Sequence, residues 1–329
     1  MAARSQPRSR PFAEFSAIAG LEALFRQSSR QVLLGIGDDA ALLRTSTGWV
    51  WTVDTAVEHV HFERSWLSLA DLGWRSFQAA ASDVSAMGGA PIAALSSVIF
   101  PPGFAEKELT QLARGQRAAA RALGCVVAGG NLSRGAELSV TTTLVGNVRR
   151  PLLRSGVRVG DELWLCGELG LAAAGLRLLQ RGVTTGKSAA ARRALRAFRR
   201  PNAQLAAGLA LARSAHAAID ISDGLAGDAA HLAHASDVAL SIDLIALTSA
   251  LSPALRALAP ELGTSALDLA LYGGEDYALL AAGPARSRPL GARVIGGASK
   301  GRGVWLSNGD RRQRAGRGFE HSAVAKARR

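Results

Sequence analysis

The chain has 329 residues, of which 48% are hydrophobic and 20% are charged, so its composition excludes an intrinsically disordered protein and allows about two domains. The formal net charge is +13 and the isoelectric point is ≈ 11.2, which favours polyanionic partners such as nucleic acid, an anionic membrane or a phosphorylated small molecule. Aromatic residues make up only 5% and are not interleaved with the basic runs, which argues against a nucleic-acid-binding protein.

Cysteine usage and hydropathy indicate the compartment. Cys125 and Cys166 stand alone without C-x-x-C spacing, which argues against a disulfide framework and against a thiolate metal site. No apolar run approaches the roughly 20 residues of a membrane-spanning helix. We therefore expect a cytoplasmic protein without a membrane partner, with a flexible tail at residues 1–14.

Hydrophobic periodicity in the first half predicts helices mixed with short strands. The predicted helices cover residues 15–25, 69–87 and 106–123, and the predicted strands cover residues 32–34, 49–53, 93–100, 125–128 and 138–148. Arg149-Arg150-Pro151 then marks a boundary. We expect an N-terminal domain at 15–148 and a C-terminal domain at 149–329.

Acidic residues in the first half stand where the predicted elements meet turns. Asp38 and Asp39 follow a Gly-Ile-Gly run, and adjacent carboxylates are costly to bury unless cations or solvent settle them. Asp54 ends a predicted strand. Asp83 lies near the C-terminal end of an alanine-rich helix, where its charge opposes the helix dipole. A bound cation would explain these positions, and an exposed acidic turn is the alternative for the first pair.

The segment 57–62 contains His59 and His61, which share a face if the segment is extended. Such a pair can bind a metal ion. Because no third ligand follows nearby, a solvated polar face is the preferred interpretation.

The second half predicts an α/β pattern. The predicted strands cover residues 162–166, 217–221 and 238–244, and the predicted helices cover residues 171–180, 189–199, 203–215 and 252–259. The stretch 182–188 looks like a phosphate-binding loop, but it is one residue short and follows a helix rather than a strand. We interpret it as a polar linker.

Two further acidic stretches follow in the second half. In the first, Asp220 and Ser222 share a face of a strand, and Asp223 follows at the turn. Ser222 or Asp223 could cap the next helix, but a cap explains one of these residues and not all of them. In the second, Glu275 and Asp276 follow a Gly-Gly turn and precede a strand.

These acidic turns indicate which ligands the protein binds. Loops at the ends of regular elements present ligands from a rigid scaffold, and ligand sets made only of oxygen suit Mg²⁺ or Mn²⁺. In a basic protein, several such turns indicate phosphates bridged to the protein through metal, as in phosphoryl transfer. Because neither a P-loop nor the protein-kinase signatures are present, a different nucleotide fold is expected.

Taken together, the acidic stretches resemble the thiamine-monophosphate kinase family, of the superfamily that includes aminoimidazole ribonucleotide synthetase and selenophosphate synthetase. The resemblance runs in family order from Phe15 to Phe319. It rests on Gly-Ile-Gly-Asp-Asp-Ala-Ala-Leu-Leu at 35–43, Thr-Val-Asp-Thr at 52–55, Ser-Asp-Val-Ser-Ala-Met-Gly-Gly-Ala-Pro at 82–91, Gly-Gly-Asn at 129–131, Ile-Asp-Ile-Ser-Asp-Gly-Leu at 219–225 and Tyr-Gly-Gly-Glu-Asp-Tyr at 272–277.

The resemblance implies an ATP-dependent kinase that makes thiamine diphosphate by direct transfer of the γ-phosphoryl group, with several Mg²⁺ ions. It also implies an α+β fold of two domains, each a mixed sheet packed with helices, and a homodimer formed through the N-terminal domain. That domain would bind metal and ATP, and the C-terminal domain would complete the active site.

The resemblance assigns roles residue by residue. The implied metal ligands are Asp39, Thr52, the Val53 carbonyl, Asp54, Asp83, Asn131, Asp220 and Asp223, of which Asp54, Asp83, Asp220 and Asp223 would be catalytic. The implied nucleotide contacts are Gly130, Asn131, Arg154 and Ser222. The implied contacts to thiamine monophosphate are His61, Glu275 and Phe319.

Two positions depart from the family pattern. Val53 stands where the family usually has a hydroxyl residue, and a backbone carbonyl can still bind metal there. Asn131 stands where the family usually has an aspartate, and its amide offers a carbonyl oxygen without the charge.

Two other functions remain open beside the kinase. One is another ATP-using synthetase of the same superfamily, although no catalytic cysteine near the N-terminus supports selenophosphate synthesis. The other is a non-catalytic paralogue that binds thiamine phosphates, which the departures at Val53 and Asn131 suggest.

Overall fold

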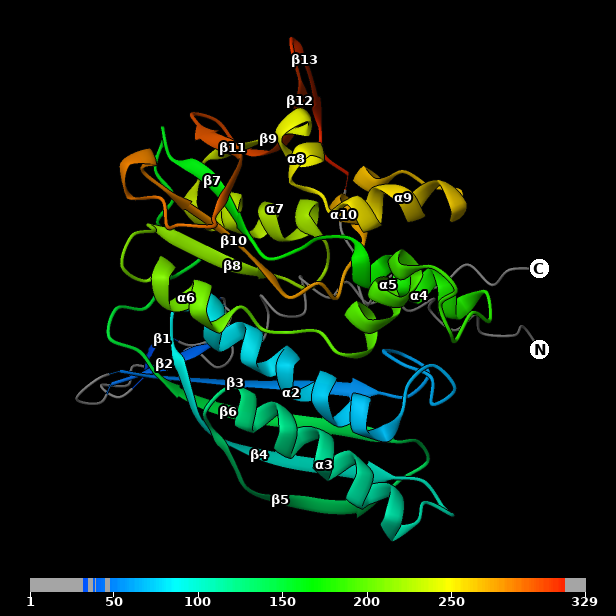
Figure 1. Ribbon diagram of the computed structural model, residues 1–329. Coiled ribbons are helices and arrows are strands. Elements are labelled where there is room, and N and C mark those ends of the chain that lie inside the picture. Colours follow the sequence, from blue (N-terminus) through cyan, green and yellow to red (C-terminus); the bar gives the residue numbers. More distant parts are fainter. Residues whose placement is uncertain (1–31, 35–37, 39, 45–47, 317–329) are drawn as a thin grey trace, which may run out of the picture.

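The structure, a computed structural model, describes residues 32–34, 38, 40–44 and 48–316 (Figure 1). It consists of two mixed β-sheets, each packed with helices, so the expected α+β fold of two domains is confirmed. The predicted helix at 15–25, the tail at 1–14, Asp39 and Phe319 lie outside the described residues. None of the helices formed by the described residues has the length and apolarity needed to cross a bilayer.

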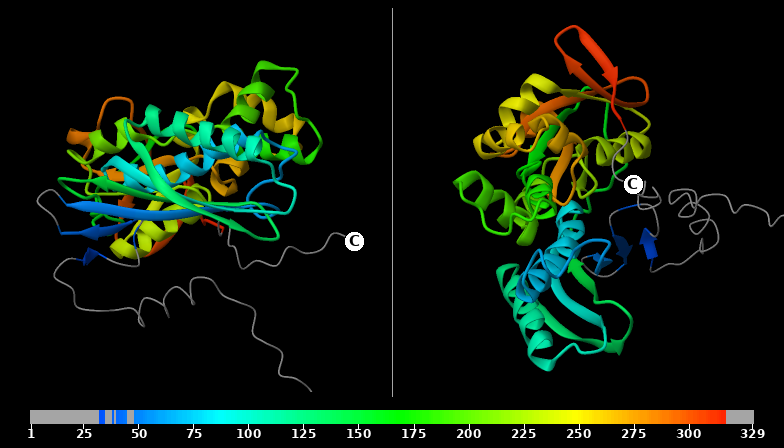
Figure 2. Two further views of the ribbon diagram at one scale, coloured as in Figure 1. Left: turned by 90° about the horizontal axis from the view of Figure 1, so that it is seen from below. Right: turned by 90° about the vertical axis from the view of Figure 1, so that its right-hand side faces the viewer.

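The N-terminal sheet has six strands in the order β1-β2-β3-β6-β4-β5. Its strands are β1 Val32–Leu34, β2 Ala41–Leu43, β3 Trp49–Val57, β4 Ala90–Phe100, β5 Val126–Arg134 and β6 Ser139–Asn147. Only β4 and β5 pair in parallel, and the other neighbours are antiparallel. The helices α2 Leu69–Ala86 and α3 Glu106–Ala122 lie on one face of this sheet (Figure 2).

Small residues bring α2 and α3 into close contact. A Cβ atom at Gly73 would lie 2.1 Å from the Leu112 carbonyl oxygen, and one at Gly115 would lie 2.0 Å from that of Ala70. Ser68 begins α2 by accepting a hydrogen bond from the Asp71 backbone N–H. The cap at Ser68 and the packing against α3 therefore hold α2 in place. Its other faces contact strands of both sheets.

The C-terminal sheet has seven strands in the order β13-β12-β9-β11-β7-β10-β8. Its strands are β7 Glu162–Cys166, β8 Ala217–Ile221, β9 Ala239–Asp243, β10 Ala278–Gly283, β11 Arg293–Ser299, β12 Gly303–Asn308 and β13 Arg311–Arg314. Its helices are α4 Leu171–Gln180, α5 Ala189–Arg199, α6 Leu205–Leu211, α7 Leu225–Ser236, α8 Leu244–Ala250, α9 Pro253–Glu261 and α10 Ala266–Tyr272.

Two helices join the domains. Both α2 and α6 lie between the two sheets in Figure 1, and α2 contacts β3 and β6 on one side and β8 on the other. The core between them contains the fully buried Trp164 together with Ala86 and Leu211. Since α2 carries Asp83 and β8 carries Asp220, this packing brings acidic residues of both domains to one region.

Some predicted elements end elsewhere than expected. Strand β3 continues past Asp54 to Val57, because every residue from Trp49 to Val57 pairs with β6. Gly129-Gly130-Asn131 lies inside β5 and not in a turn after it. A Cβ atom at Gly130 would lie 1.8 Å from the Ser96 carbonyl oxygen, so the glycine there permits close pairing with β4.

The segment with His59 and His61 forms a turn rather than an extended strand. His59 has a φ of 65°, and the His61 backbone N–H donates to the Val57 carbonyl oxygen over 2.9 Å, so the chain turns here. Phe62 is 1% exposed and returns the chain to the core. The two histidines therefore do not share a face of a strand.

Candidate functional site

Two loops of the C-terminal domain cross at very short range, and glycine permits the crossing. The Glu275 backbone N–H donates to the Ser222 carbonyl oxygen over 2.7 Å. A Cβ atom at Gly274 would lie 2.4 Å from that same oxygen, and one at Gly224 would lie 2.2 Å from the Gly273 carbonyl oxygen. The second and third acidic stretches of the sequence are thus one structural unit.

The crossing aims Glu275 at the N-terminal domain. Glu275 has a φ of 69°, a left-handed conformation that is uncommon outside glycine and often marks functional sites. Its carboxylate accepts a hydrogen bond of 2.6 Å from the Tyr277 hydroxyl and forms an ion pair with Arg75 of α2. Burial first, and then the charge of Glu275, raise the pKa of Tyr277 well above its usual value. Tyr277 therefore stays a hydroxyl donor.

Arg75 is a site residue that sequence reasoning missed. Its side chain is 3% exposed, donates to the Phe198 carbonyl oxygen and lies 4.1 Å from the centre of the Phe198 ring. One signal was available, because Arg75 precedes Ala79 by four residues and Ser82 by seven, and so lies on the small-residue face of the predicted helix. An arginine on the packed side of an alanine-rich helix needs an acidic partner.

The N-terminal side of the site is built on β3 and α2. Thr52 is 8% exposed and donates from its hydroxyl to Asp83 Oδ2 over 2.5 Å, which satisfies the carboxylate at the unfavourable end of α2. Asp54 lies two residues further on the same face of β3. Asp54 lines a small cavity of ≈ 30 Å³ together with His61, Arg75, Glu275 and Tyr277. The structure therefore places Asp54 beside the predicted substrate contacts.

A larger cavity of ≈ 660 Å³ opens next to it. Its walls combine aromatic and aliphatic side chains with polar groups of the crossing loops, including Trp66, Phe198, Tyr272, His61, Ser222, Asp223 and Glu275. The His61 Nδ1 atom accepts the Val57 backbone N–H over 3.1 Å, which fixes its ring. Four of the predicted site residues thus line one cavity.

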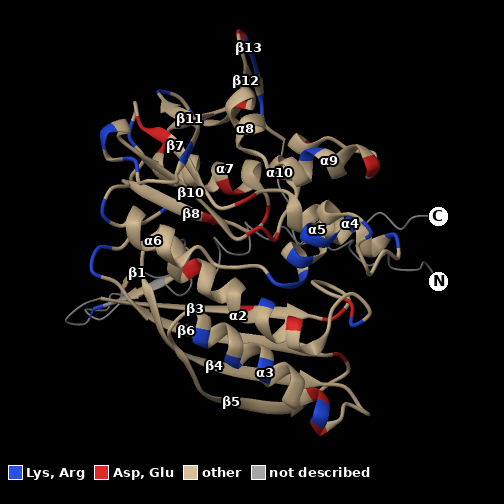
Figure 3. Cartoon of the chain, viewed as in Figure 1, with Lys and Arg blue, Asp and Glu red and all other residues tan. Residues whose placement is uncertain are grey.

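Asp220 lies within β8 and Asp223 follows the strand; Asp223 lines the larger cavity, whereas Asp220 lines neither of the two cavities. Asp220 is 5% exposed within the strand. The helix α7 begins after Gly224, which is its N-cap residue and has no side chain to cap it. The Asp223 backbone N–H donates to Asp228 Oδ2 over 3.1 Å. Acidic residues of this region are visible between the two sheets in Figure 3.

Asp276 is turned away from the crossing and caps α4. Its carboxylate accepts the Gly170 backbone N–H over 2.7 Å and that of Ala172 over 3.3 Å. Burial raises the pKa of Asp276 to about 7, while these two backbone donors oppose the rise. The neighbours Glu275 and Asp276 therefore have separate roles.

Three predicted nucleotide contacts are not beside this cavity within one chain. The register places Asp54 opposite Thr142, Thr142 opposite Ser96 and Ser96 opposite Gly130. Three strand spacings of about 4.8 Å put Gly130 roughly 14 Å from Asp54. Arg154 lies elsewhere, and its backbone N–H donates to Asp38 Oδ2 over 3.1 Å.

The predicted metal ligands supply oxygen donors but not a preformed cluster. Among the described residues, no three His, Cys, Asp or Glu side chains are grouped closely enough to hold one ion. Val53 points its side chain, 62% exposed, to the face of β3 opposite Thr52 and Asp54, so only its backbone can serve. The hydroxyl of Thr52 and the carboxylates of Asp54 and Asp83 are the hard donors that Mg²⁺ prefers.

Comparison with known proteins adds family information. Residues 37–148 match the family model described as AIR synthase related protein, N-terminal domain, and residues 158–315 match the corresponding C-terminal domain. The chain is 35% identical to a thiamine-monophosphate kinase of Aquifex aeolicus over 277 residues, which cover 82% of this chain and 88% of the relative. It is 36% identical to that of Mycobacterium tuberculosis over 299 residues, which cover 89% and 87%.

Solved structures agree with these relatives. A structure described as AaThiL complexed with AMPPCP and TMP is 31% identical, has a TM-score of 0.85 and covers 94% of this chain and 96% of its own. Thiamine-monophosphate kinase from Stenotrophomonas maltophilia K279a is 34% identical, with a TM-score of 0.73 and coverages of 90% and 96%. The hydrogenase maturation protein HypE, 17% identical with a TM-score of 0.64 and coverages of 91% and 97%, shares the fold alone.

Proposed function

The chain belongs to the thiamine-monophosphate kinase family and phosphorylates thiamine monophosphate to thiamine diphosphate with ATP, and we propose that the γ-phosphoryl group is transferred directly among the carboxylates between its two domains. One observation carries this proposal. The cavity of ≈ 660 Å³ that holds His61, Ser222, Asp223 and Glu275 adjoins the small cavity that holds Asp54, and His61 and Glu275 line both. A substrate-sized space therefore meets acidic residues suited to phosphate chemistry.

The larger cavity suits the thiamine part of the substrate. Thiamine carries a cationic ring, and the aromatic side chains of Trp66, Phe198 and Tyr272 in the walls attract cations through their faces. Glu275 adds a negative charge at the same cavity, and His61 adds a fixed ring. We place thiamine monophosphate here, with its phosphate toward Asp54. Phe319, which the family resemblance adds as a third contact, lies outside the described residues.

The chain's oxygen donors would hold the metal. We propose Asp39, Thr52, the Val53 carbonyl, Asp54, Asp83, Asn131, Asp220 and Asp223 as the ligand set, of which Asp54, Asp83, Asp220 and Asp223 act at the reacting phosphates. Bound Mg²⁺ neutralises phosphate charge and bridges the phosphates to carboxylates. Thr52 orients Asp83, and Arg75 together with Tyr277 holds Glu275 in place.

The nucleotide contacts support a homodimer. Gly130 and Asn131 on β5 lie about three strand spacings from Asp54 in one chain, which is too far for a common ion. Asn131 stands opposite Ser97, on the sheet face that carries neither α2 nor α3. We propose that Gly130 and Asn131 of one copy complete the nucleotide site of a second copy, together with Arg154 and Ser222.

The same sheet face offers an apolar surface for that second copy. Trp49, Trp51, Val53, Leu95 and Ile99 point away from the helices and are between 39% and 62% exposed. A contiguous patch of this kind is typical of an interface. The proposed dimerisation surface thus accounts for the apolar side chain of Val53, while its backbone carbonyl stays in the proposed ligand set. We further propose that residues 15–148 form the domain that dimerises and binds metal and ATP, and that residues 149–329 complete the site.

The activity is tested with purified protein, ATP, Mg²⁺ and thiamine monophosphate, followed by separation of the thiamine species. We expect thiamine diphosphate and ADP in equal amounts, and no product after metal removal with EDTA. Binding of the monophosphate without product at any Mg²⁺ concentration would favour the non-catalytic paralogue. Neither product nor binding would favour another synthetase of the superfamily.

The dimer is tested by light scattering and by subunit complementation. Leu95→Glu should give a monomer of 34.1 kDa, whereas Leu290→Glu, at a fully exposed apolar position, should stay dimeric. Co-expressed Asp54→Asn and Asn131→Ala chains should recover part of the activity that each lacks alone. A monomeric wild-type protein that is fully active would exclude the shared site.

We also propose a cytoplasmic location. Cys125 and Cys166 are both buried free thiols, and burial raises the pKa of each to about 11, so neither is a reactive thiolate.

A further inference from the structure

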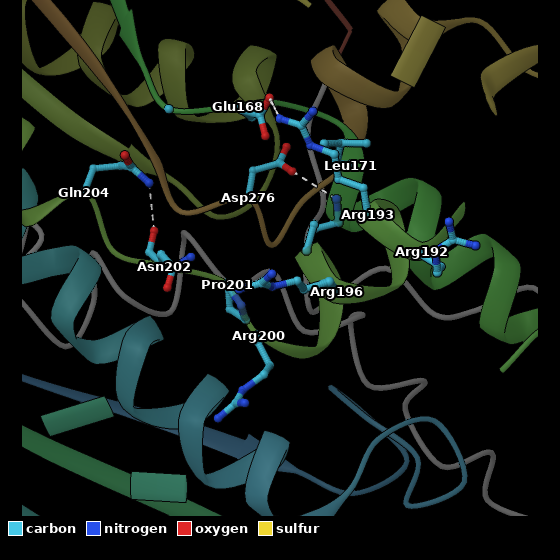
Figure 4. A pocket seen from close by; sticks show the side chains of 13 residues that line it. Glu168, Leu171, Arg192, Arg193, Arg196, Arg200, Pro201, Asn202, Gln204 and Asp276 are labelled. Atoms are coloured by element: carbon cyan, nitrogen blue, oxygen red, sulfur yellow. Dashed lines mark hydrogen bonds and ion pairs between the residues drawn. The ribbon is translucent and has the colours of Figure 1, made fainter. Parts of the chain in front are cut away.

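A second large cavity lies beside the one assigned to thiamine monophosphate and has a different character. It measures ≈ 550 Å³ and is lined by Arg192, Arg193, Arg196 and Arg200, by Asn202 and Gln204, and by the start of α4 (Figure 4). None of the residues proposed as metal ligands lines it. The chemistry of this cavity is therefore cationic, whereas that of the active site is acidic.

The four arginines come from one helix and its C-terminal end. Arg192, Arg196 and Arg200 are spaced by four residues, so they follow one side of α5 at intervals of about 6 Å. Figure 3 shows α5 as a concentrated basic segment of the chain. Like charges at this spacing destabilise a helix slightly, and α5 contains no acidic residue to balance them. An anion bound among them would remove that repulsion.

Three of these four arginines make side-chain contacts with described residues, and two of the three pair with a carboxylate. Arg193 pairs with Glu168 at 2.6 Å, Arg200 pairs with Asp71 at 3.3 Å, and Arg192 donates to the carbonyl oxygens of the 186–187 loop. The guanidinium of Arg196 has no hydrogen bond or ion pair with any residue that the structure describes, although its backbone carbonyl accepts the Arg200 N–H. In Figure 4 its side chain extends along the cavity between the other polar residues.

The acidic residues at the cavity do not neutralise Arg196. The Asp276 carboxylate is engaged by the Gly170 and Ala172 backbone N–H groups. Glu168 is engaged by Arg193. A second hollow of ≈ 340 Å³ on the other side of α5 is also lined by Arg192, Arg196 and Arg200, which extends the cationic surface around the helix.

We propose that this cavity binds the phosphate groups of a small phosphorylated molecule, with the Arg196 guanidinium as its central ligand and Arg193, Asn202 and Gln204 around it. Guanidinium groups bind phosphate through paired, charge-assisted hydrogen bonds, and side-chain amides add neutral donors. The volume admits a diphosphate or triphosphate group with part of its carrier. This site is independent of the kinase reaction and does not rest on the proposed metal ligands.

The cationic cavity and the thiamine cavity share part of their walls. Ala172 lines both cavities, and α5 presents Phe198 to the thiamine cavity while it presents Arg196 to the cationic one. A ligand at Arg196 would therefore contact the helix that forms one wall of the substrate cavity.

The probe for the test is inorganic triphosphate, titrated calorimetrically into the full-length protein in EDTA, so that metal-dependent binding at the active site is absent. We expect binding that weakens as salt is raised. Arg196→Gln should reduce the affinity at least tenfold, and Arg193→Gln/Arg196→Gln should reduce it further. The matched controls are Arg117→Gln and Arg114→Gln/Arg117→Gln on α3, which remove the same charges at the same spacing from exposed positions of the other domain.

Each outcome decides the proposal. Loss of affinity in the α5 variants alone, with thiamine-monophosphate kinase activity retained at saturating substrate, supports a separate phosphate site. Equal losses in the α3 controls would show a general effect of net charge and would overturn the proposal. Unchanged affinity in Arg196→Gln, or tight binding of single-stranded RNA without binding of triphosphate, would overturn it as well.

Discussion

The two walls of the proposed active site hold their polar side chains in different ways. On the β3–α2 wall, Thr52, Asp54 and Asp83 lie on regular elements, and a hydrogen bond from Thr52 orients Asp83. On the opposite wall, Ser222 and Glu275 lie on irregular loops that backbone crossing holds in place. Activity should therefore fall when a charge is removed from the first wall. Stability should fall when a single carbon atom is added to a glycine of the second wall.

Removing one charge from the β3–α2 wall should have the largest effect. Asp54→Asn keeps the shape of β3 but removes a carboxylate proposed to hold metal, so turnover should fall by at least about 1,000-fold. Steady-state formation of thiamine diphosphate measures the loss, and a melting curve shows that the fold is kept. Asp237→Asn, at an exposed carboxylate paired with Arg302, should leave turnover unchanged. Activity retained in Asp54→Asn would show that the ligand set is misassigned.

Breaking the contact between the two walls should have the second-largest effect. Arg75→Gln removes the buried cation that pairs with Glu275 and donates to Phe198, which should cost about 3 kcal/mol of stability. The freed Glu275 should also raise KM for thiamine monophosphate roughly tenfold. Arg200→Gln breaks an ion pair of the same helix with a more exposed arginine and should cost at most about 1 kcal/mol. Equal costs in the two variants would argue against a special role for Arg75.

The glycine crossing should be sensitive to a methyl group. Gly274→Ala places a Cβ atom 2.4 Å from the Ser222 carbonyl oxygen, which forces the loops apart and should cost about 2 kcal/mol. Gly129→Ala is the control, because its Cβ atom would meet only a Leu95 side-chain atom at 3.6 Å. Urea unfolding measures both. If Gly274→Ala were as stable as Gly129→Ala, close crossing would not be what holds the second wall.

The carboxylate behind the crossing should give the second wall a pH dependence. Burial raises the pKa of Asp276 from 3.8 to about 7, so the native state keeps a proton that the unfolded state has lost. Its contribution to stability is therefore complete below about pH 4 and is lost as the pH rises toward 7, by about 1 kcal/mol from pH 6 to pH 7. Asp276→Asn, neutral at every pH, should flatten this slope. An unchanged slope would assign the pH dependence to other groups.

How far the sequence predicted the site depends on which wall is considered. The ordered acidic motifs placed Asp54, Asp83, Ser222, Asp223 and Glu275 in one family site, because their residue types carry the chemistry. The crossing of two loops 50 residues apart could not be read from either loop alone, since it depends on packing between Gly224 and Gly274.

The turn at His59 and the burial of Arg75 were not predicted from the sequence, for two different reasons. His59 and His61 could share a face only on an extended segment, but hydrogen bonds back to Val57 and burial of Phe62 form a turn instead. Arg75 carried no motif, and its partner lies 200 residues later in the chain. Strand β5 continues to Arg134, past its predicted end at residue 128, because its glycines permit close pairing with β4.

The smallest predicted effect concerns Asn131, which belongs to neither wall of its own chain. Its amide nitrogen donates to the Ser133 hydroxyl over 3.0 Å, so its carbonyl oxygen is left for a ligand on the proposed dimer face. A carboxylate at this position would add charge without changing shape, and Asn131→Asp should lower the Mg²⁺ concentration at half-maximal activity by a few-fold. Asn147→Asp, at the exposed C-terminal end of strand β6, controls for added charge. Identical Mg²⁺ titrations of the native protein and Asn131→Asp would remove Asn131 from the ligand set, and with it the reason for a second copy to complete the metal site.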